Sequence, residues 1–165
     1  MVEPLTIDTE RAAASSDTNV SAEDAAEIQS LVAAYFQRTD RPSERAVADL
    51  FAPDGALILG PLRLEGRQAI ATFFANRNTE QAETGRVTRH VHGGIELLAR
   101  GIDCIEGHSA TLVFAGTGVT PLPSALPTTI CDFDDVYVRN DGNWLFQERR
   151  ATVVFTGAGA ATFAK

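Results

Sequence analysis

Residues 128–155 read TTICDFDDVYVRNDGNWLFQERRATVVF, and this segment establishes the class of fold. Two runs rich in β-branched and aromatic residues, 128–139 and 144–155, flank the sequence Asn140-Asp-Gly-Asn143. Asp-Gly between two such runs is a strong hairpin signal, because both residues tolerate the positive φ that a tight turn requires. The segment therefore predicts two long antiparallel strands.

Two earlier stretches, 86–99 and 108–119, have the same strand-like composition. Turn-forming residues separate them from each other at Arg100–Asp103 and from the final pair at Thr120–Pro127. The second half of the chain is therefore predicted to be a meander of four long strands.

The first half has helical periodicity instead. Ser21 is placed to cap a helix, with Asp24 three residues later in the manner of a capping box. One apolar face then follows at three-and-four spacing: Ile28, Leu31, Val32, Tyr35 and Phe36. The helix should end near Thr39 or Asp40, before Pro42.

Shorter elements are expected between this helix and the long strands. They are a short helix over 43–50, a turn over 51–55, strand pieces over 56–59 and 61–64, a third helix over 68–76 and a polar loop over 77–85. Helices followed by a run of strands indicate an α+β fold.

Length and composition suit one domain of 165 residues, with a flexible arm over 1–20, the domain over 21–155 and a Gly/Ala-rich tail over 156–165. The formal net charge of -8 argues against nucleic acid and against an anionic membrane surface as partners. Without a secretory signal or a span-length apolar stretch, a cytoplasmic location is expected. Cys104 and Cys131 are expected to be reduced, buried thiols. The sequence contains no CxxC motif, so a structural zinc site is not expected.

Three short motifs occur in an informative order. They are Leu50-Phe-Ala-Pro-Asp-Gly-Ala56, Leu64-Glu-Gly-Arg-Gln-Ala-Ile70 and Tyr137-Val-Arg-Asn-Asp-Gly-Asn-Trp144. With the predicted order of elements, the chain resembles the SnoaL-like part of the NTF2-like superfamily over about residues 21–155. The resemblance implies a cone, in which a curved, mainly antiparallel mixed sheet wraps around about three N-terminal helices and encloses an apolar pocket.

The resemblance also implies candidate catalytic residues. Dehydratases and dehydrochlorinases of the superfamily use a histidine on the first long strand with an aspartate at the end of the first helix, and the matching positions are His90 and Asp40. A neutral imidazole can accept a proton near pH 7, and a carboxylate on its other nitrogen stabilises the imidazolium. Tyr35 matches a tyrosine whose hydroxyl polarises a carbonyl or protonates a leaving oxygen, and Arg149 matches an arginine that holds a developing anion.

Substrate-binding candidates are His92, Asp134, Phe73 and Trp144. Residues two apart in a strand share a face, so alternation does not choose between His90 and His92 as the base. Alternation also puts Asp132 and Asp134 on one face and Phe133, Asp135 and Tyr137 on the other. Asp134 roughly matches the protonated aspartate of ketosteroid isomerases, but their base falls near Gly60, where no carboxylate exists.

Each candidate also has a structural interpretation. Asp40 could end a helix in solvent, Tyr35 could be a core residue, Arg149 could lie on the surface, and the aspartates of 132–135 could form a solvated face. A histidine in a strand is also commonly structural.

The expected function is a cofactor-independent lyase or isomerase, of dehydratase or cyclase type, acting without metal on a small hydrophobic cyclic substrate such as a polyketide, steroid or aromatic compound. The alternatives are a non-catalytic ligand-binding or dimerising module and a dioxygenase β subunit. A homodimer or higher homo-oligomer is expected to pair through the outer face of the sheet.

Overall fold

The computed structural model describes residues 19–123 and 125–161, so nearly all of the predicted N-terminal arm and the last four residues of the predicted tail lie outside the described residues. Helical segments are α1 (Ala22–Asp40), the 3-10 turn η1 (Val47–Leu50) and α2 (Gly66–Thr84). The strands are β1 (Phe51–Leu59), β2 (Leu62–Glu65), β3 (Arg86–His92), β4 (Glu96–Gly101), β5 (Cys104–Thr117), β6 (Thr129–Asn140) and β7 (Asn143–Thr156). This order confirms the α+β prediction.

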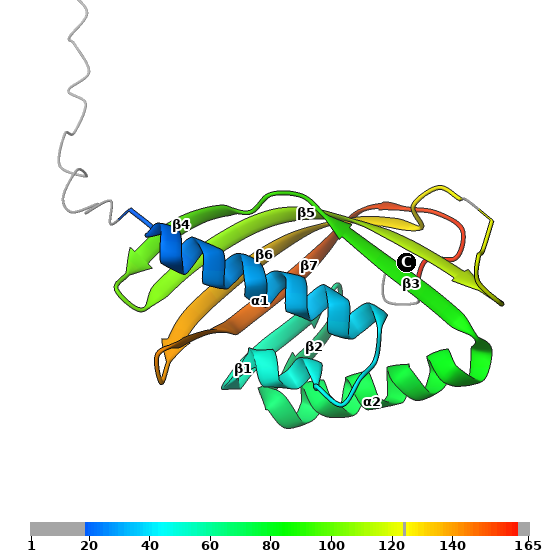
Figure 1. The fold of residues 1–165 in the computed structure, drawn as a ribbon, viewed down its shortest axis with the longest axis horizontal. Helices are drawn as coiled ribbons and strands as arrows, with labels where there is room; N and C mark the ends of the chain where they lie inside the picture. Colours follow the sequence, from blue (N-terminus) through cyan, green and yellow to red (C-terminus); the bar gives the residue numbers. More distant parts are fainter. Residues whose placement is uncertain (1–18, 124, 162–165) are drawn as a thin grey trace, which may run out of the picture.

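All seven strands form one sheet in the order β2-β1-β7-β6-β5-β3, and β4 also pairs with β5. Every pairing is antiparallel except that of β1 with β7, which is parallel. The sheet curves over α1, while α2 lies below β1 and β2, so that the elements enclose a cone (Figure 1). The predicted curved mixed sheet is therefore confirmed, and the short helix predicted over 43–50 is a four-residue 3-10 turn between two α-helices.

The predicted strand over 86–99 is two strands in the structure. Residues Gly93, Gly94 and Ile95 interrupt it, because β3 pairs with one end of β5 and β4 pairs with the other. Glycine pairs are poor strand formers, so the break falls where the sequence allows it.

The first helix forms as predicted, and side chains of β6 and β7 contact its N-terminal end. The hydroxyl of Ser21 accepts a hydrogen bond from the backbone N–H of Asp24 at 3.0 Å. The indole Nε1 of Trp144 donates to Asp24 at 2.8 Å, and Arg139 also forms an ion pair with Asp24. Trp144 therefore binds the N-terminal end of α1, about 24 Å along the helix from Asp40 at 1.5 Å per residue.

The second long helix is much longer than predicted, and the predicted loop over 77–85 is wrong. Residues 77–84 have no apolar stripe, so hydrophobic periodicity gives no signal there. Most of them nevertheless favour helix, and the segment continues α2 until Gly85 ends it at φ 66°. Neither α1 nor α2 has the length and hydropathy of a membrane-spanning helix.

The predicted turn over 51–55 is also wrong, because these residues begin β1. The pairing of β1 with β7 shifts register between Phe51 and Ala56, and this irregularity accommodates the Pro-Asp-Gly sequence within the strand. Gly55 lies so close to β7 that an added Cβ would stand 2.8 Å from the carbonyl oxygen of Phe146. The strand therefore requires glycine at this position.

We predict that Gly55→Ala lowers the free energy of unfolding by about 1–3 kcal/mol, because the methyl group meets rigid backbone rather than a movable side chain. Urea denaturation measures the difference. Gly94→Ala is the matched control, since a Cβ there has nothing within 4 Å. Equal stability of the two variants would contradict this account.

Candidate functional site

A cavity of about 110 Å³ lies between the two helices and the concave face of the sheet. Its apolar walls come from α2, four strands and the tail: Leu59, Phe73, Phe74, Val113, Cys131, Phe133, Ala151 and Ala161. Its polar groups are Tyr35, Thr39, Arg77, Arg86, Thr88, His90, Thr128 and Thr129. The cavity is thus mainly apolar with polar groups gathered near the ends of α1 and β3, as in many ligand sites.

Asp40 and His90 form the central polar contact at this cavity. Asp40 is the last residue of α1, and its Oδ1 lies 2.6 Å from Nδ1 of His90 on β3. Its Oδ2 accepts the backbone N–H of His90 at 2.7 Å, and the Thr88 hydroxyl donates to Oδ1 at 2.9 Å. Burial acts to raise the pKa of Asp40, but the contacts with His90 and Thr88 outweigh it and hold the pKa below its ordinary value.

The charge state of Asp40 determines which nitrogen of His90 can act as a base. A carboxylate only accepts hydrogen bonds, so Nδ1 of His90 must carry a proton and Nε2 is left with the lone pair of the neutral ring. The ring stacks on Phe36 at 5.3 Å between centroids, which fixes its plane. The arrangement can therefore receive a proton at Nε2 and stabilise the resulting imidazolium through Asp40.

His92 shares a face with His90, as alternation predicts. Its ring stacks on the same Phe36 at 5.2 Å, but its Nδ1 lies 3.0 Å from the carbonyl oxygen of Gly93 rather than near a carboxylate. His92 does not line the cavity. Geometry therefore distinguishes the two histidines where strand alternation could not, because His90 alone has both a carboxylate partner and a place in the cavity wall.

Tyr35 lines the cavity, whereas Arg149 does not. The Arg149 side chain is fully buried, and its guanidinium lies against the Tyr35 ring at 4.3 Å and the Phe133 ring at 4.2 Å. Burial raises the pKa of Tyr35, opposed by the positive charge of Arg149. Arg149 is neither a surface residue nor a cavity residue, so it can act on the site only through the rings that cover it.

Asp135 is the partner of Arg149 and was not among the predicted site residues. Its Oδ2 accepts from Nη1 of Arg149 at 3.1 Å and from the Tyr137 hydroxyl at 2.8 Å. Burial raises the pKa of Asp135, and the charge of Arg149 opposes this shift. The predicted face shared by Phe133, Asp135 and Tyr137 is the buried one, and this pattern could have identified Asp135.

Asp134 lies on the opposite, outer face and does not line the cavity. It is exposed and pairs with His108 at 2.9 Å. Its predicted role in substrate binding is therefore not supported, because one residue along a strand reverses the face. Trp144 is likewise absent from the cavity wall, since its indole binds Asp24, while the prediction for Phe73 agrees with its position in the wall.

Two arginines of the cavity were missed. Nη1 of Arg77 donates to the carbonyl oxygen of Thr39 at 2.7 Å and to Oε1 of Gln81 at 3.1 Å. Its Nη2 donates to the Thr88 hydroxyl at 3.1 Å, which in turn donates to Asp40. Arg77 follows Phe73 by one helical turn, so extending the third predicted helix would have placed it on the inner face.

Arg86 lies at the start of β3, where its Nη2 donates to the carbonyl oxygen of Gly159 at 3.0 Å. The tail segment 157–161 returns to the sheet here, with the N–H of Gly157 bonded to the carbonyl oxygen of Thr128 at 2.8 Å. Part of the predicted tail therefore closes one side of the cavity.

Both cysteines are free thiols, with Cys131 buried in the cavity wall and Cys104 half-buried. Burial raises the pKa of Cys131 to about 11, so its thiol is a poor nucleophile. Among residues 19–123 and 125–161, no group of three or more His, Cys, Asp or Glu side chains could hold a metal ion.

Comparison with known proteins gives a family match and several similar folds. The model of the SnoaL-like domain matches residues 20–150. A protein assigned as a scytalone dehydratase, from Novosphingobium aromaticivorans DSM 12444, is 21% identical with a TM-score of 0.67, covering 82% of this chain and 87% of that chain. ActVI-ORFA from Streptomyces coelicolor is 23% identical with a TM-score of 0.68, covering 80% of this chain and 96% of that chain.

A type 2 hexachlorocyclohexane dehydrochlorinase is 21% identical with a TM-score of 0.65, covering 82% of this chain and 89% of that chain. No protein of curated function matches the sequence significantly. At these identities the similar structures establish the fold, and with the family match they confirm the predicted SnoaL-like, NTF2-like assignment.

We predict that Arg149→Met destabilises the protein by about 3–5 kcal/mol, because it leaves the Asp135 carboxylate buried without a cation. Guanidinium unfolding measures the loss. The triple variant Arg149→Met, Asp135→Leu, Tyr137→Phe removes the whole polar group and should regain most of the stability. If the triple variant is no more stable than Arg149→Met, the loss of stability comes from packing and not from an unpaired charge.

Proposed function

The chain belongs to the SnoaL-like domain family, and from this premise we propose that it is a cofactor-independent lyase or isomerase of the dehydratase or cyclase type. The single observation that carries the proposal is the contact of 2.6 Å between Asp40 and His90 at the wall of an apolar cavity. In the proposal His90 is the general base and Asp40 orients and stabilises it.

The proposed reaction begins with proton transfer from a carbon next to a carbonyl group. Nε2 of His90 takes this proton, and Asp40 stabilises the imidazolium that forms. The Tyr35 hydroxyl donates a hydrogen bond to the carbonyl oxygen as it gains negative charge. In a dehydration, the carbon–oxygen bond at the β position then breaks, and the imidazolium returns its proton to the departing oxygen to give water.

The cavity supports a small hydrophobic substrate. Its walls are mainly aliphatic and aromatic, and such surroundings strengthen the electrostatic interactions of His90 and Tyr35 by excluding water. A volume of about 110 Å³ is comparable with the roughly 150 Å³ of an engineered cavity that accepts benzene. We therefore expect a substrate whose enclosed part is about one ring in size. In this proposal Phe73 contacts the substrate, and Arg149 positions the ring of Tyr35.

We predict that His90→Ala lowers turnover by about 10²–10⁴-fold, the usual contribution of a general base. The assay uses single-ring β-hydroxy ketones such as 3-hydroxycyclohexanone, with enone formation followed by ultraviolet absorbance. His92→Ala is the matched control and should retain turnover, because His92 is outside the cavity wall. Far-ultraviolet circular dichroism and cyclohexenone binding check that His90→Ala keeps its fold and its cavity.

Full turnover by His90→Ala would exclude the proposed base. A wild-type protein that eliminates water from none of these ketones while still binding cyclohexenone would favour the alternative of a ligand-binding module.

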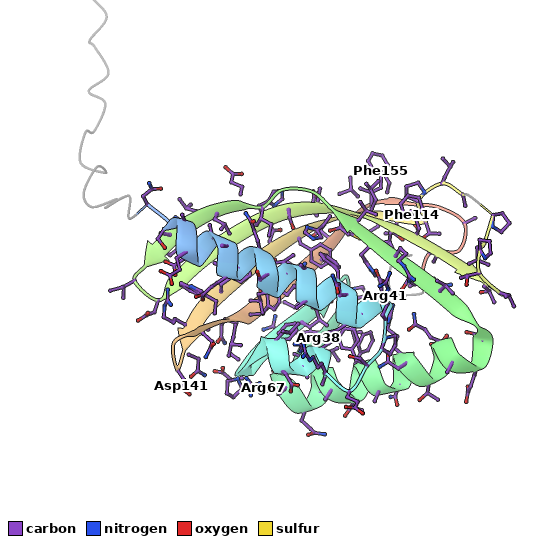
Figure 2. The ribbon with its side chains drawn as sticks, in the orientation of Figure 1. Arg38, Arg41, Arg67, Phe114, Asp141 and Phe155 are labelled. Carbon is purple, nitrogen blue, oxygen red and sulfur yellow. The ribbon has the colours of Figure 1, made fainter. Side chains whose placement is uncertain are left out.

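A second property proposed for this chain is pairing with another copy through the outer face of the sheet. Cross-strand neighbours on that face form an apolar row, Val91, Leu112, Ile130 and Phe155, with Phe155 65% exposed. Phe114 and Phe155 lie on the side of the sheet away from the helices (Figure 2). A second cross-strand row, Glu96, His108, Asp134 and Arg150, alternates acidic and basic side chains. An exposed apolar row beside alternating charges suits a self-complementary contact.

We predict a mass of twice 17.7 kDa in solution, measured by light scattering during size-exclusion chromatography. Leu112→Glu should give a monomer, because it places a charge in the middle of the apolar row. Ile102→Glu is the control, since Ile102 is 90% exposed in the turn between β4 and β5 and away from that row. A wild-type monomer, or a Leu112→Glu dimer, would contradict pairing through this face.

A further inference from the structure

Arg77 and Arg86 are two positive charges in the cavity wall that have no carboxylate partner among residues 19–123 and 125–161. Arg77 donates to three neutral acceptors, which are the Thr39 carbonyl, the Gln81 amide oxygen and the Thr88 hydroxyl. Arg86 bonds to the Gly159 carbonyl. Both arginines are half-buried, and they differ in this from the fully buried Arg149, which has Asp135.

We infer that the cavity takes a ligand with a carboxylate on a compact apolar body, and that Arg77 and Arg86 bind the carboxylate. The inference rests on the proposed function only in using the same cavity as the ligand site. It adds a chemical class of substrate and a direction of binding.

The remaining hydrogen-bonding capacity of Arg77 fits a carboxylate. A guanidinium has five N–H donors, and three of those of Arg77 meet protein acceptors. One N–H on Nε and one on Nη2 are left for a ligand, and we infer that this edge of the guanidinium faces the two oxygens of the carboxylate. The protein contacts also immobilise the side chain, so little rotamer freedom is lost when an anion binds.

Electrostatics favours an anion at the same place. Burial lowers the pKa of Arg77, and the nearby positive charge of Arg86 acts in the same direction. Tyr35, Asp40 and Glu80 offset this in part. The oxygens of Asp40 are already engaged by His90 and Thr88, and Glu80 is an exposed residue of α2 outside the cavity wall. A ligand carboxylate between the two arginines would supply the missing negative charge, which is most effective in a partly desolvated site.

The position of Arg77 also sets the direction of the ligand. Thr88 accepts from Arg77 at 3.1 Å and donates to Asp40 at 2.9 Å, and Asp40 contacts His90 at 2.6 Å. A ligand carboxylate bound at Arg77 would therefore be linked to His90 through the Thr88 hydroxyl and the Asp40 carboxylate. A ligand held at Arg77 by its charged end would direct its apolar body along Phe73, Phe74 and Phe133, with His90 beside it.

Calorimetric titration of the full chain with benzoate and with benzamide at neutral pH and low salt tests the inference. The two probes have nearly the same shape, and only benzoate is charged. Benzoate should bind about 10- to 100-fold more tightly, the usual value of hydrogen bonds to a charged group. Arg86→Gln should reduce this preference, and Arg77→Lys should reduce it further because lysine lacks the paired donors.

Arg63→Gln is the control, because Arg63 is an exposed residue of β2 outside the cavity and should leave the preference unchanged. Arg86→Gln keeps the test decisive if Arg77→Lys does not fold, since in the part of the chain that the structure describes the Arg86 side chain is bonded to the tail alone. Equal binding of the two probes, no binding of either, or an undiminished preference in Arg86→Gln would each overturn the inference.

The same titration with His90→Ala separates this inference from the proposed function. A preference for benzoate in a variant that has lost turnover supports both. A preference for benzoate together with full turnover by His90→Ala supports the arginine site and excludes the proposed base. Loss of turnover in His90→Ala without any preference for benzoate supports the proposed base and excludes the arginine site.

Discussion

The guanidinium of Arg149 holds the first helix against the sheet. It is fully buried, and four aromatic rings from three elements lie within 4.2–4.9 Å of it: Tyr35, Phe36, Phe133 and Phe146. Cation–π contacts of this kind gain strength when water is excluded, and Asp135 balances the charge. The same rings shape the cavity, since Tyr35 and Phe133 form its wall and Phe36 supports His90. The geometry of the candidate site is therefore built on a charge that lies outside the cavity wall.

Above this aromatic layer, a polar network sets the orientation of the reactive groups. Hydrocarbon packing leaves side chains free to rotate by small amounts, whereas hydrogen bonds fix direction as well as distance. Thr88 has the central position, because it connects Arg77 of α2, Asp40 of α1 and, through Asp40, His90 of β3. Three elements thus meet at one hydroxyl group, and the position of each helix influences the orientation of His90.

Local signals in the sequence were sufficient for most of the fold. The Asp-Gly turn at 141–142, the cap at Ser21 and the apolar face from Ile28 to Phe36 each produced the predicted element. The predicted second long helix is too short because the last two turns of α2 are polar and give no hydrophobic periodicity. Only contacts made in the folded chain show that Arg77 and Gln81 face inward. His90 and Asp40 came from the resemblance to a family, since their sequence separation of 50 carries no local signal. Asp134 was only a rough match to the family, and it lies outside the cavity wall because adjacent residues of a strand point to opposite faces.

The first helix is held at both ends, by Trp144 at Asp24 and by His90 at Asp40. It therefore acts as a spacer of fixed length, and this restricts how the protein can evolve. Inserting or deleting one residue within α1 would rotate everything beyond it by about 100°, which would separate one end from its partner even if the other end held. Related sequences can vary by substitution along this helix, but changes of length should be confined to turns such as 93–95 and 118–123, which lie outside the helices and strands.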